Sequence, residues 1–239
     1  MKKVVVTGVS RGLGLAIAQR LVREGYAVLG FSRTLTDEYR ALCDSSDGAA
    51  TFAALDMSDL DAVAVAGRDI IKKHKPIFGL VNNAGIGTDG VLATMHVTDI
   101  EKIIATNLLG PIILTKYVMR SMLTRREGRI INITSIIAST GFHGLAVYAA
   151  SKAGLEGFTR SLSREAGKLK VTVNSVAPGY METEMTAGLA GDKLESVRRR
   201  APLGLPTPGQ AAGAVVYLLS DDGAAVTGRV LTVDGGSTA

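Results

Sequence analysis

The 239-residue chain contains no tryptophan and a single cysteine, Cys43. A lone cysteine excludes an intrachain disulfide and a cysteine-based zinc site, and it favours a reducing compartment. Aromatic residues make up only 5% of the chain and the basic residues are scattered, so nucleic-acid binding is not expected. No apolar run reaches the roughly 18 residues of a membrane span. The run after Lys3 stops at Thr7, too soon for a secretory signal, so we expect a cytoplasmic protein that does not bind membranes.

The composition that remains is that of a folded globular protein. Hydrophobic residues account for 46% and charged residues for 21% of the chain, which excludes a disordered polypeptide. The formal net charge of +5 favours anionic ligands such as phosphates. Because the length suits one domain, we expect a single domain over residues 1–239.

Short β-branched runs alternate with amphipathic stretches along the chain. Strands are expected at residues 4–7, 27–31, 51–55, 77–82, 129–134, 171–176 and 230–233, and helices at 13–24, 59–73, 98–123, 147–168 and 209–219. This alternation predicts an α/β protein with a Rossmann fold, a doubly wound parallel sheet of seven strands with helices on both faces.

The segment 179–208 differs from the regular alternation. It contains several prolines and follows the carboxyl end of a strand, where open α/β sheets bind ligands. Long segments at such places often cover a site, so we expect a substrate lid. A plain surface excursion is the alternative.

A glycine-rich turn lies between the first expected strand and helix. Gly8, Gly12 and Gly14 allow a tight turn and the close approach of a pyrophosphate, and the following helix offers free N–H groups and a positive dipole end. The spacing is G-x-x-x-G-x-G. Glycine turns after strands are common, so the spacing alone is not decisive. The position of this turn between a strand and a helix is what predicts a dinucleotide site.

The end of the second strand has no acidic residue. In NAD-binding folds a carboxylate there binds the ribose 2′-hydroxyl. Here Arg33 occupies this region, and Arg11 can reach the same space from the glycine turn. Guanidinium groups bind phosphate oxygens by paired hydrogen bonds. We therefore expect NADP(H) rather than NAD, the alternative being two solvated surface arginines.

Ser135, Tyr148 and Lys152 form a candidate catalytic set. Tyr148 and Lys152 are four residues apart and share one helix face. An ammonium near a phenol is expected to lower the phenol pKa from about 10, towards the working pH of an acid catalyst. Ser135 follows a strand and could bind a carbonyl oxygen. A lone Y-x-x-x-K is usually just a helix face, but the set beside a dinucleotide motif is specific.

The three histidines predict no metal site. His74, His96 and His143 are far apart in sequence and form no ligand motif. Each is expected to be a surface or packing residue, although His143 lies between Ser135 and Tyr148 and could contact a substrate.

These motifs together resemble the short-chain dehydrogenase/reductase family over essentially the whole chain. In order they are Thr7-Gly8-x-x-x-Gly12-x-Gly14, Asp56, Asn82-Asn83-Ala84-Gly85, Asn107, Ser135, Tyr148-x-x-x-Lys152, and Pro178-Gly179 with Thr183. Within the family the chain is most similar to the 3-oxoacyl-[acyl-carrier-protein] reductases. The sequence segments that carry this similarity are those around Ser135, Tyr148 and Pro178, and the segment Val226–Gly236.

The resemblance implies residue roles. Tyr148 would be the general acid, Lys152 would hold the nicotinamide ribose, Ser135 would orient the carbonyl, and Asn107 would hold a water that links Lys152 to solvent. The implied cofactor-binding residues are Gly8, Ser10, Arg11, Gly12, Leu13, Gly14, Arg33, Asp56, Met57, Asn83, Ala84, Gly85, Tyr148, Lys152, Pro178, Gly179, Met181 and Thr183. Ser135 and Tyr148 would bind the substrate.

The implied reaction is NADPH-dependent reduction of a 3-oxoacyl thioester, on acyl carrier protein or CoA, to the 3-hydroxyacyl thioester. Another small ketone or alcohol (a sugar, steroid or polyketide) is the alternative substrate. A non-catalytic nucleotide-binding protein is disfavoured by the intact catalytic set.

Two associations are also implied. Basic residues at Arg125, Arg126, Arg129, Lys168 and Lys170 could hold an acidic carrier, or they could be ordinary solvated charges. Family members commonly form homotetramers, and Leu155 and Phe158 are candidate interface residues.

Overall fold

Seven strands form one parallel sheet. In this computed structural model the described residues are 1–88, 90–182 and 192–239, without the side chains of residues 192–194. The strands are β1 (Lys3–Thr7), β2 (Ala27–Ser32), β3 (Ala50–Ala54), β4 (Gly79–Asn82), β5 (Gly128–Ile133), β6 (Val171–Pro178) and β7 (Val230–Val233). Their order is β3-β2-β1-β4-β5-β6-β7, and every neighbouring pair is parallel. The predicted fold class and all seven predicted strands are confirmed.

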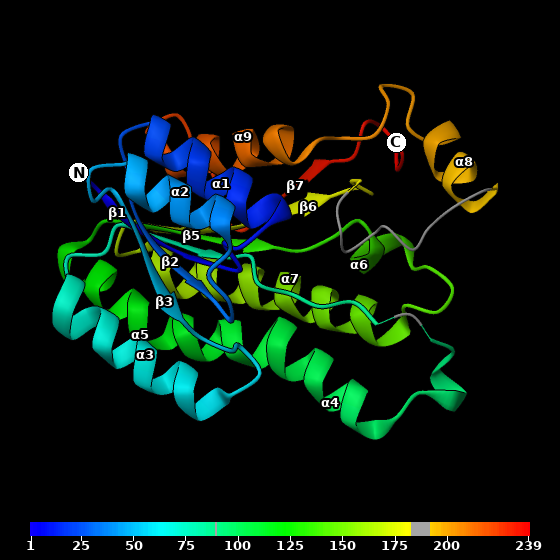
Figure 1. Cartoon of the computed structure of the whole chain (residues 1–239), viewed down its shortest axis with the longest axis horizontal. Coiled ribbons are helices and arrows are strands. Elements are labelled where there is room, and N and C mark those ends of the chain that lie inside the picture. Colours follow the sequence, from blue (N-terminus) through cyan, green and yellow to red (C-terminus); the bar gives the residue numbers. More distant parts are fainter. Residues whose placement is uncertain (89, 183–191) are drawn as a thin grey trace.

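Helices cover both faces of the sheet (Figure 1). They are α1 (Gly12–Arg23), α2 (Asp37–Ser45), α3 (Leu60–His74), α4 (Val97–Ile104), α5 (Gly110–Arg125), α6 (Ile137–Thr140), α7 (Ala146–Gly167), α8 (Asp192–Arg199) and α9 (Pro208–Leu219), with a 3-10 turn η1 (Leu92–Thr94) and a π turn η2 (Ala105–Leu109). Helices α1, α2 and α9 lie on one face, and α3, α4, α5 and α7 on the other. Within the described ranges, none of these helices is long and apolar enough to cross a membrane.

The central strands bury both of their faces, which explains their continuous apolar runs. Val4 and Val6 pack with the residues of α1 and α9, whereas Val5 packs with those of α3 and α5. All three valines are completely buried. Successive side chains of a strand point to opposite faces, so a strand between two helical layers must be apolar at every position.

Four elements were not predicted: α2, α6, α8 and η1. Helix α2 is mostly polar, and Tyr39 is its one buried residue among those described, so it lacks the apolar periodicity that identifies a core helix. The helix expected at 98–123 is divided into α4, η2 and α5. Pro111 lies at the start of α5, directly after the π turn η2, so its missing N–H falls where the helix changes from π to α hydrogen bonding.

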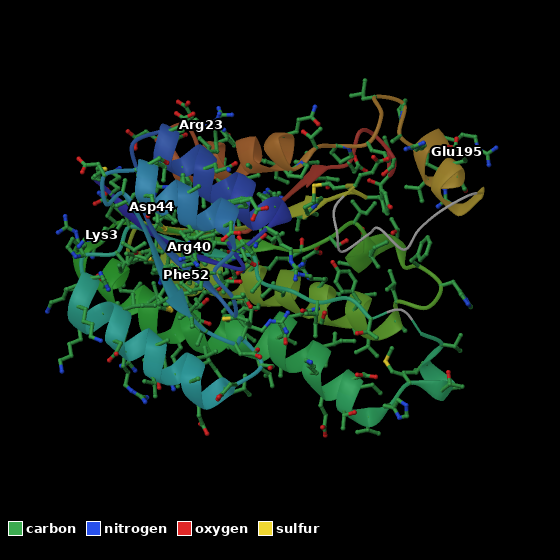
Figure 2. All side chains as sticks on the ribbon, viewed as in Figure 1. Lys3, Arg23, Arg40, Asp44, Phe52 and Glu195 are labelled. Carbon is green, nitrogen blue, oxygen red and sulfur yellow. The ribbon has the colours of Figure 1, made fainter. Side chains whose placement is uncertain are left out.

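The sheet reverses its winding between β1 and β4, and ligands of open α/β sheets bind beyond the carboxyl ends of the strands at such a point. Figure 2 shows Lys3, at the start of β1, and Glu195, on α8, at opposite ends of the molecule. The predicted lid 179–208 begins beyond the carboxyl end of β6, and residues 183–191 of it lie outside the described residues. The lid itself stays a prediction.

Candidate active site

The glycine turn after β1 has a backbone that only glycine allows. Gly8 and Gly12 have φ angles of +74° and +54°, in the left-handed region that side chains disfavour. A Cβ on Gly8 would lie 2.9 Å from the Ala84 Cα, and one on Gly14 would overlap the carbonyl oxygen of Gly8. Helix α1 starts here with no acidic residue in its first turn. Its positive end is therefore available to a pyrophosphate, so the residues fit a dinucleotide.

Asn83 and Ala84 support this turn from the end of β4. The Asn83 side-chain amide donates to the carbonyl oxygens of Thr7 (2.9 Å) and Gly8 (3.2 Å). The main-chain N–H groups of Asn83 and Ala84 both donate to the Thr7 hydroxyl over 3.0 Å. The Asn83 side chain thus shapes the turn, and Thr7, absent from the implied cofactor set, is part of the same support.

A hollow of about 330 Å³ lies at the ends of β2 and β3. It is lined by Arg33, Ala54, Leu55, Asp56, Asp59 and Ala62. Burial alone would raise the pKa of Asp56, but hydrogen bonds from Ser58 and the nearby charges of Arg33 and Lys102 lower it below the ordinary value. An ionised carboxylate and an exposed arginine in one hollow suit an adenine ring with a 2′-phosphate.

Met57, the neighbour of Asp56, is only 4% exposed. Its side chain packs in the core between the sheet and α3. Only its main chain is therefore available to a ligand in the hollow.

Helix α7 presents Tyr148 and Lys152 to the carboxyl end of β5, where Ser135 lies. The Lys152 Nζ donates to the carbonyl oxygen of Ile133 over 2.8 Å and lies 5.7 Å from the centre of the Tyr148 ring. Ser135 is hydrogen-bonded to the Tyr148 hydroxyl. The predicted catalytic set is thus assembled in space.

The electrostatics of this set differ from the expectation. Burial raises the pKa of Tyr148, and the hydrogen bond with Ser135 only partly offsets that effect. Burial lowers the pKa of Lys152 to about 8. The expected lowering of the phenol pKa is therefore wrong for this structure: burial is the main effect on Tyr148 and raises its pKa, and Lys152 is not among the described groups that shift it. A phenol with a raised pKa retains its proton at neutral pH, as a general acid must.

Asn107 lies in the π turn η2. Its side-chain oxygen accepts from the N–H of Ile86 (2.9 Å), and its amide donates to the Ile86 carbonyl (2.8 Å) and to the Ser151 hydroxyl (3.1 Å). The two donors of the amide are thus used, which leaves one oxygen lone pair for a water. The Ser151 hydroxyl donates in turn to the Tyr148 carbonyl over 2.7 Å, so Asn107 is coupled to α7.

The end of β6 carries the remaining implied residues. The Gly179 N–H donates to Val233 over 2.9 Å, and a Cβ at this glycine would lie 2.7 Å from the Asp234 Cβ. Pro178 ends β6, and Met181 is half-buried beyond it. Thr183 lies outside the described residues.

Gly85 marks the meeting point of the catalytic elements. A Cβ there would lie 3.3 Å from the Lys152 Nζ and 3.4 Å from the Asn107 Oδ1. The carbonyl groups of Ile86 and Ile133 were not foreseen, since main-chain groups carry no sequence signal. Ser151 was also missed, although its place before Lys152 made it a candidate. His143 is exposed, and its contact with a substrate stays a prediction.

Comparisons with known proteins agree with this geometry. A family model for short chain dehydrogenase matches residues 2–193. The chain is 41% identical over 240 residues to the 3-oxoacyl-[acyl-carrier-protein] reductases FabG of Escherichia coli and Vibrio harveyi, covering 98% of this chain and 96% of each relative. It is 40% identical over 242 residues to that of Pseudomonas aeruginosa, with the same coverage.

Among solved structures, one from Beutenbergia cavernae superposes with a TM-score of 0.94 at 34% identity, covering 99% of this chain and 96% of that one. It is assigned as an NAD(P)-dependent gluconate 5-dehydrogenase and has NADP bound at low occupancy. A short chain dehydrogenase/reductase family protein superposes with a TM-score of 0.88, also at 34% identity, covering 98% and 96% of the two chains. With the glycine turn, the Ser135–Tyr148–Lys152 set and these likenesses established, this chain belongs to the short-chain dehydrogenase/reductase family.

Proposed function

We propose that this chain is an NADPH-dependent reductase that converts a 3-oxoacyl thioester, carried by acyl carrier protein or CoA, to the 3-hydroxyacyl thioester. The hydrogen-bonded Ser135–Tyr148 pair beside the buried Lys152 amine carries the proposal. The full-length similarity to relatives named as 3-oxoacyl-[acyl-carrier-protein] reductases supports the substrate class. We also propose the cytoplasm as the location and fatty acid biosynthesis as the setting.

The cofactor would be held along the carboxyl edge of the sheet. The glycine turn and the start of α1 would bind the pyrophosphate, and Arg11 and Arg33 the 2′-phosphate. Asp56 would meet the adenine, and Lys152 the nicotinamide ribose. When bound, NADPH supplies the hydride that the carbonyl carbon accepts.

The protein's own part in the reaction is to orient the carbonyl and deliver a proton. The hydroxyl groups of Ser135 and Tyr148 would donate to the carbonyl oxygen, where negative charge grows as the C=O π bond breaks. Tyr148 then transfers its proton to that oxygen, giving the alcohol, and the phenolate regains a proton from solvent. Asn107 and Ser151 hold the first turn of α7 in place.

A group of basic residues lies at the ends of α5 and α7, where an acidic carrier was expected to bind. The Arg126 guanidinium donates to the Lys168 carbonyl over 3.1 Å, which brings the two helix ends together. Arg129, by contrast, is only 7% exposed and lies 5.6 Å from the centre of the Phe78 ring, so it does not belong to this surface. The surface lies at the start of β5 and β6, and β5, with six residues, spans about 20 Å. A carrier bound here would therefore face away from Tyr148 of the same chain, which favours the alternative that these residues are ordinary solvated charges.

The decisive experiment follows NADPH absorbance with acetoacetyl thioesters of CoA and of carrier protein. We expect turnover of both, with a lower KM for the carrier form. Tight NADPH binding without turnover of either would overturn the acyl-thioester assignment. Turnover of a keto-gluconate instead would favour the sugar alternative, which the structural neighbour assigned as a gluconate 5-dehydrogenase supports.

We further propose a homotetramer. Leu155 cannot serve as an interface residue, because it is 1% exposed within the single chain. Exposed apolar side chains lie instead at Leu109 before α5, at Tyr217 on α9 and at Leu231 on the edge strand β7. The unpaired N–H and C=O groups of an edge strand can pair with a strand of another chain. Light scattering should give four times the chain mass, and a stable monomer at working concentration would reject the proposal.

A further inference from the structure

Two hydrogen bonds tie the glycine turn to the segment that follows β2. The Thr36 hydroxyl donates to the main-chain oxygen of Ser10 over 2.6 Å, and the Ser32 hydroxyl donates to the Ser10 hydroxyl over 3.0 Å. Ser10 directly precedes Arg11, and Ser32 directly precedes Arg33. Both bonds therefore lie beside the arginines proposed to bind the 2′-phosphate.

Thr36 can serve as an anchor because the helix that it caps is fixed to the sheet. Thr36 is the N-cap of α2 and accepts from the N–H of Tyr39 over 3.4 Å. Tyr39 is completely buried, and its hydroxyl donates to the Thr51 carbonyl over 3.2 Å. Gly30 leaves room for this ring, since a Cβ there would overlap the Tyr39 hydroxyl. The first turn of α2 thus has a fixed position against β2 and β3.

The bond from Thr36 fixes the peptide between Ser10 and Arg11. In a trans peptide the C=O and N–H groups point in opposite directions. A carbonyl held towards Thr36 therefore directs the Arg11 N–H away from α2. Gly8 and Gly12 flank this peptide with positive φ angles, and glycines leave a backbone free to turn unless other contacts hold it.

We propose that Thr36 is a positioning residue for the 2′-phosphate subsite, acting through Ser10 and Arg11 without touching the cofactor. The inference rests on the NADPH binding proposed above. The hydrogen bonds of Thr36 and Ser32 to Ser10 hold the main chain at Arg11 and Arg33 at a fixed separation before the phosphate binds. Less ordering of the main chain is therefore required on binding. The glycine turn itself meets the pyrophosphate of NADPH and NADH alike, whereas this tie serves only the phosphorylated cofactor.

Calorimetric titration of NADPH and NADH, without acyl substrate, tests the inference on three variants. Thr36→Val removes the hydroxyl at constant shape, Thr36→Gly removes it while leaving an acceptable N-cap, and Thr36→Ser retains it. One lost hydrogen bond corresponds to a roughly three- to tenfold weaker Kd. We expect this loss for NADPH with the valine and glycine variants, a change below about twofold for NADH, and parental values with serine.

A matched control separates this role from simple capping. Thr207 is the N-cap of α9 in a capping box, so Thr207→Val removes an equivalent cap without contacting the glycine turn. Equal losses for both cofactors in Thr36→Val, or no loss in Thr36→Gly, would overturn the inference. If the parent protein itself failed to prefer NADPH, the cofactor proposal would fall instead. Amide hydrogen exchange of residues 10–14 would then decide on the tie, because an unchanged rate in Thr36→Val would disprove it.

Discussion

Replacing Tyr148 with phenylalanine should reduce kcat for the ketoreductase reaction by about 10³-fold, within the range of 10²–10⁴ typical of a lost general acid. The variant retains the ring and loses only the hydroxyl that is hydrogen-bonded to Ser135. Ser135 would still donate a hydrogen bond to the carbonyl oxygen, but its aliphatic hydroxyl is a far weaker acid than a phenol and would not transfer its proton. The measurement is the steady-state rate of NADPH oxidation with acetoacetyl-CoA.

The NADPH dissociation constant should change less than about twofold in this variant, since the ring that borders Gly87 remains. Tyr26→Phe is the matched control. Its hydroxyl donates to the Leu219 carbonyl over 3.4 Å near the opposite end of the sheet, so kcat should be unaffected. A Tyr148→Phe enzyme with near-parental kcat would mean that another group supplies the proton.

Replacing Arg33 with aspartate should weaken NADPH binding by about 10- to 150-fold, the cost of losing a hydrogen bond to a charged group. The new carboxylate would add repulsion against the phosphate and create the acidic residue that binds a ribose 2′-hydroxyl in NAD-binding folds. NADH binding should hold steady or improve. Calorimetric titration with both cofactors checks this result.

Arg23→Asp is the control for net charge. Arg23, labelled in Figure 2, is exposed in the last turn of α1, at the opposite end of that helix from the glycine turn and Arg11. The charge change is the same, so a purely long-range effect would weaken NADPH equally in both variants. Equal losses of NADPH and NADH with Arg33→Asp would show that Arg33 does not bind the 2′-phosphate.

The layered fold could be predicted because its central strands are continuous runs of β-branched residues. Val4, Val5 and Val6 are all buried, and such unbroken β-branched runs occur where a strand is covered on both faces. Helix α2 was not predicted because it is mostly polar: within the described chain, Tyr39 is its one buried residue, and Leu42 and Cys43 pack only partly against the core. The contact of the Tyr39 hydroxyl with the Thr51 carbonyl is tertiary, and no local sequence pattern encodes it.

The site was predictable at its side chains and unpredictable at its backbone. Ser135, Tyr148 and Lys152 have fixed spacings, and the structure brings them together. The carbonyl groups of Ile86 and Ile133 that accept from Asn107 and Lys152 are available in any residue type. The sign of the Tyr148 pKa shift also depends on burial, which spacing does not reveal.

The π turn at Ala105–Leu109 has a consequence for how this chain tolerates change in length. A π turn holds one residue more than the regular helix would, and each residue of a helix adds about 100° of rotation. Deleting one residue here would shorten the π turn towards regular helical spacing, but it would rotate α4 relative to α5 by about 100°. Asn107 would then leave Ile86 and Ser151. A more regular helix at residues 105–109 would therefore cost the contacts by which Asn107 holds the catalytic helix α7 in place.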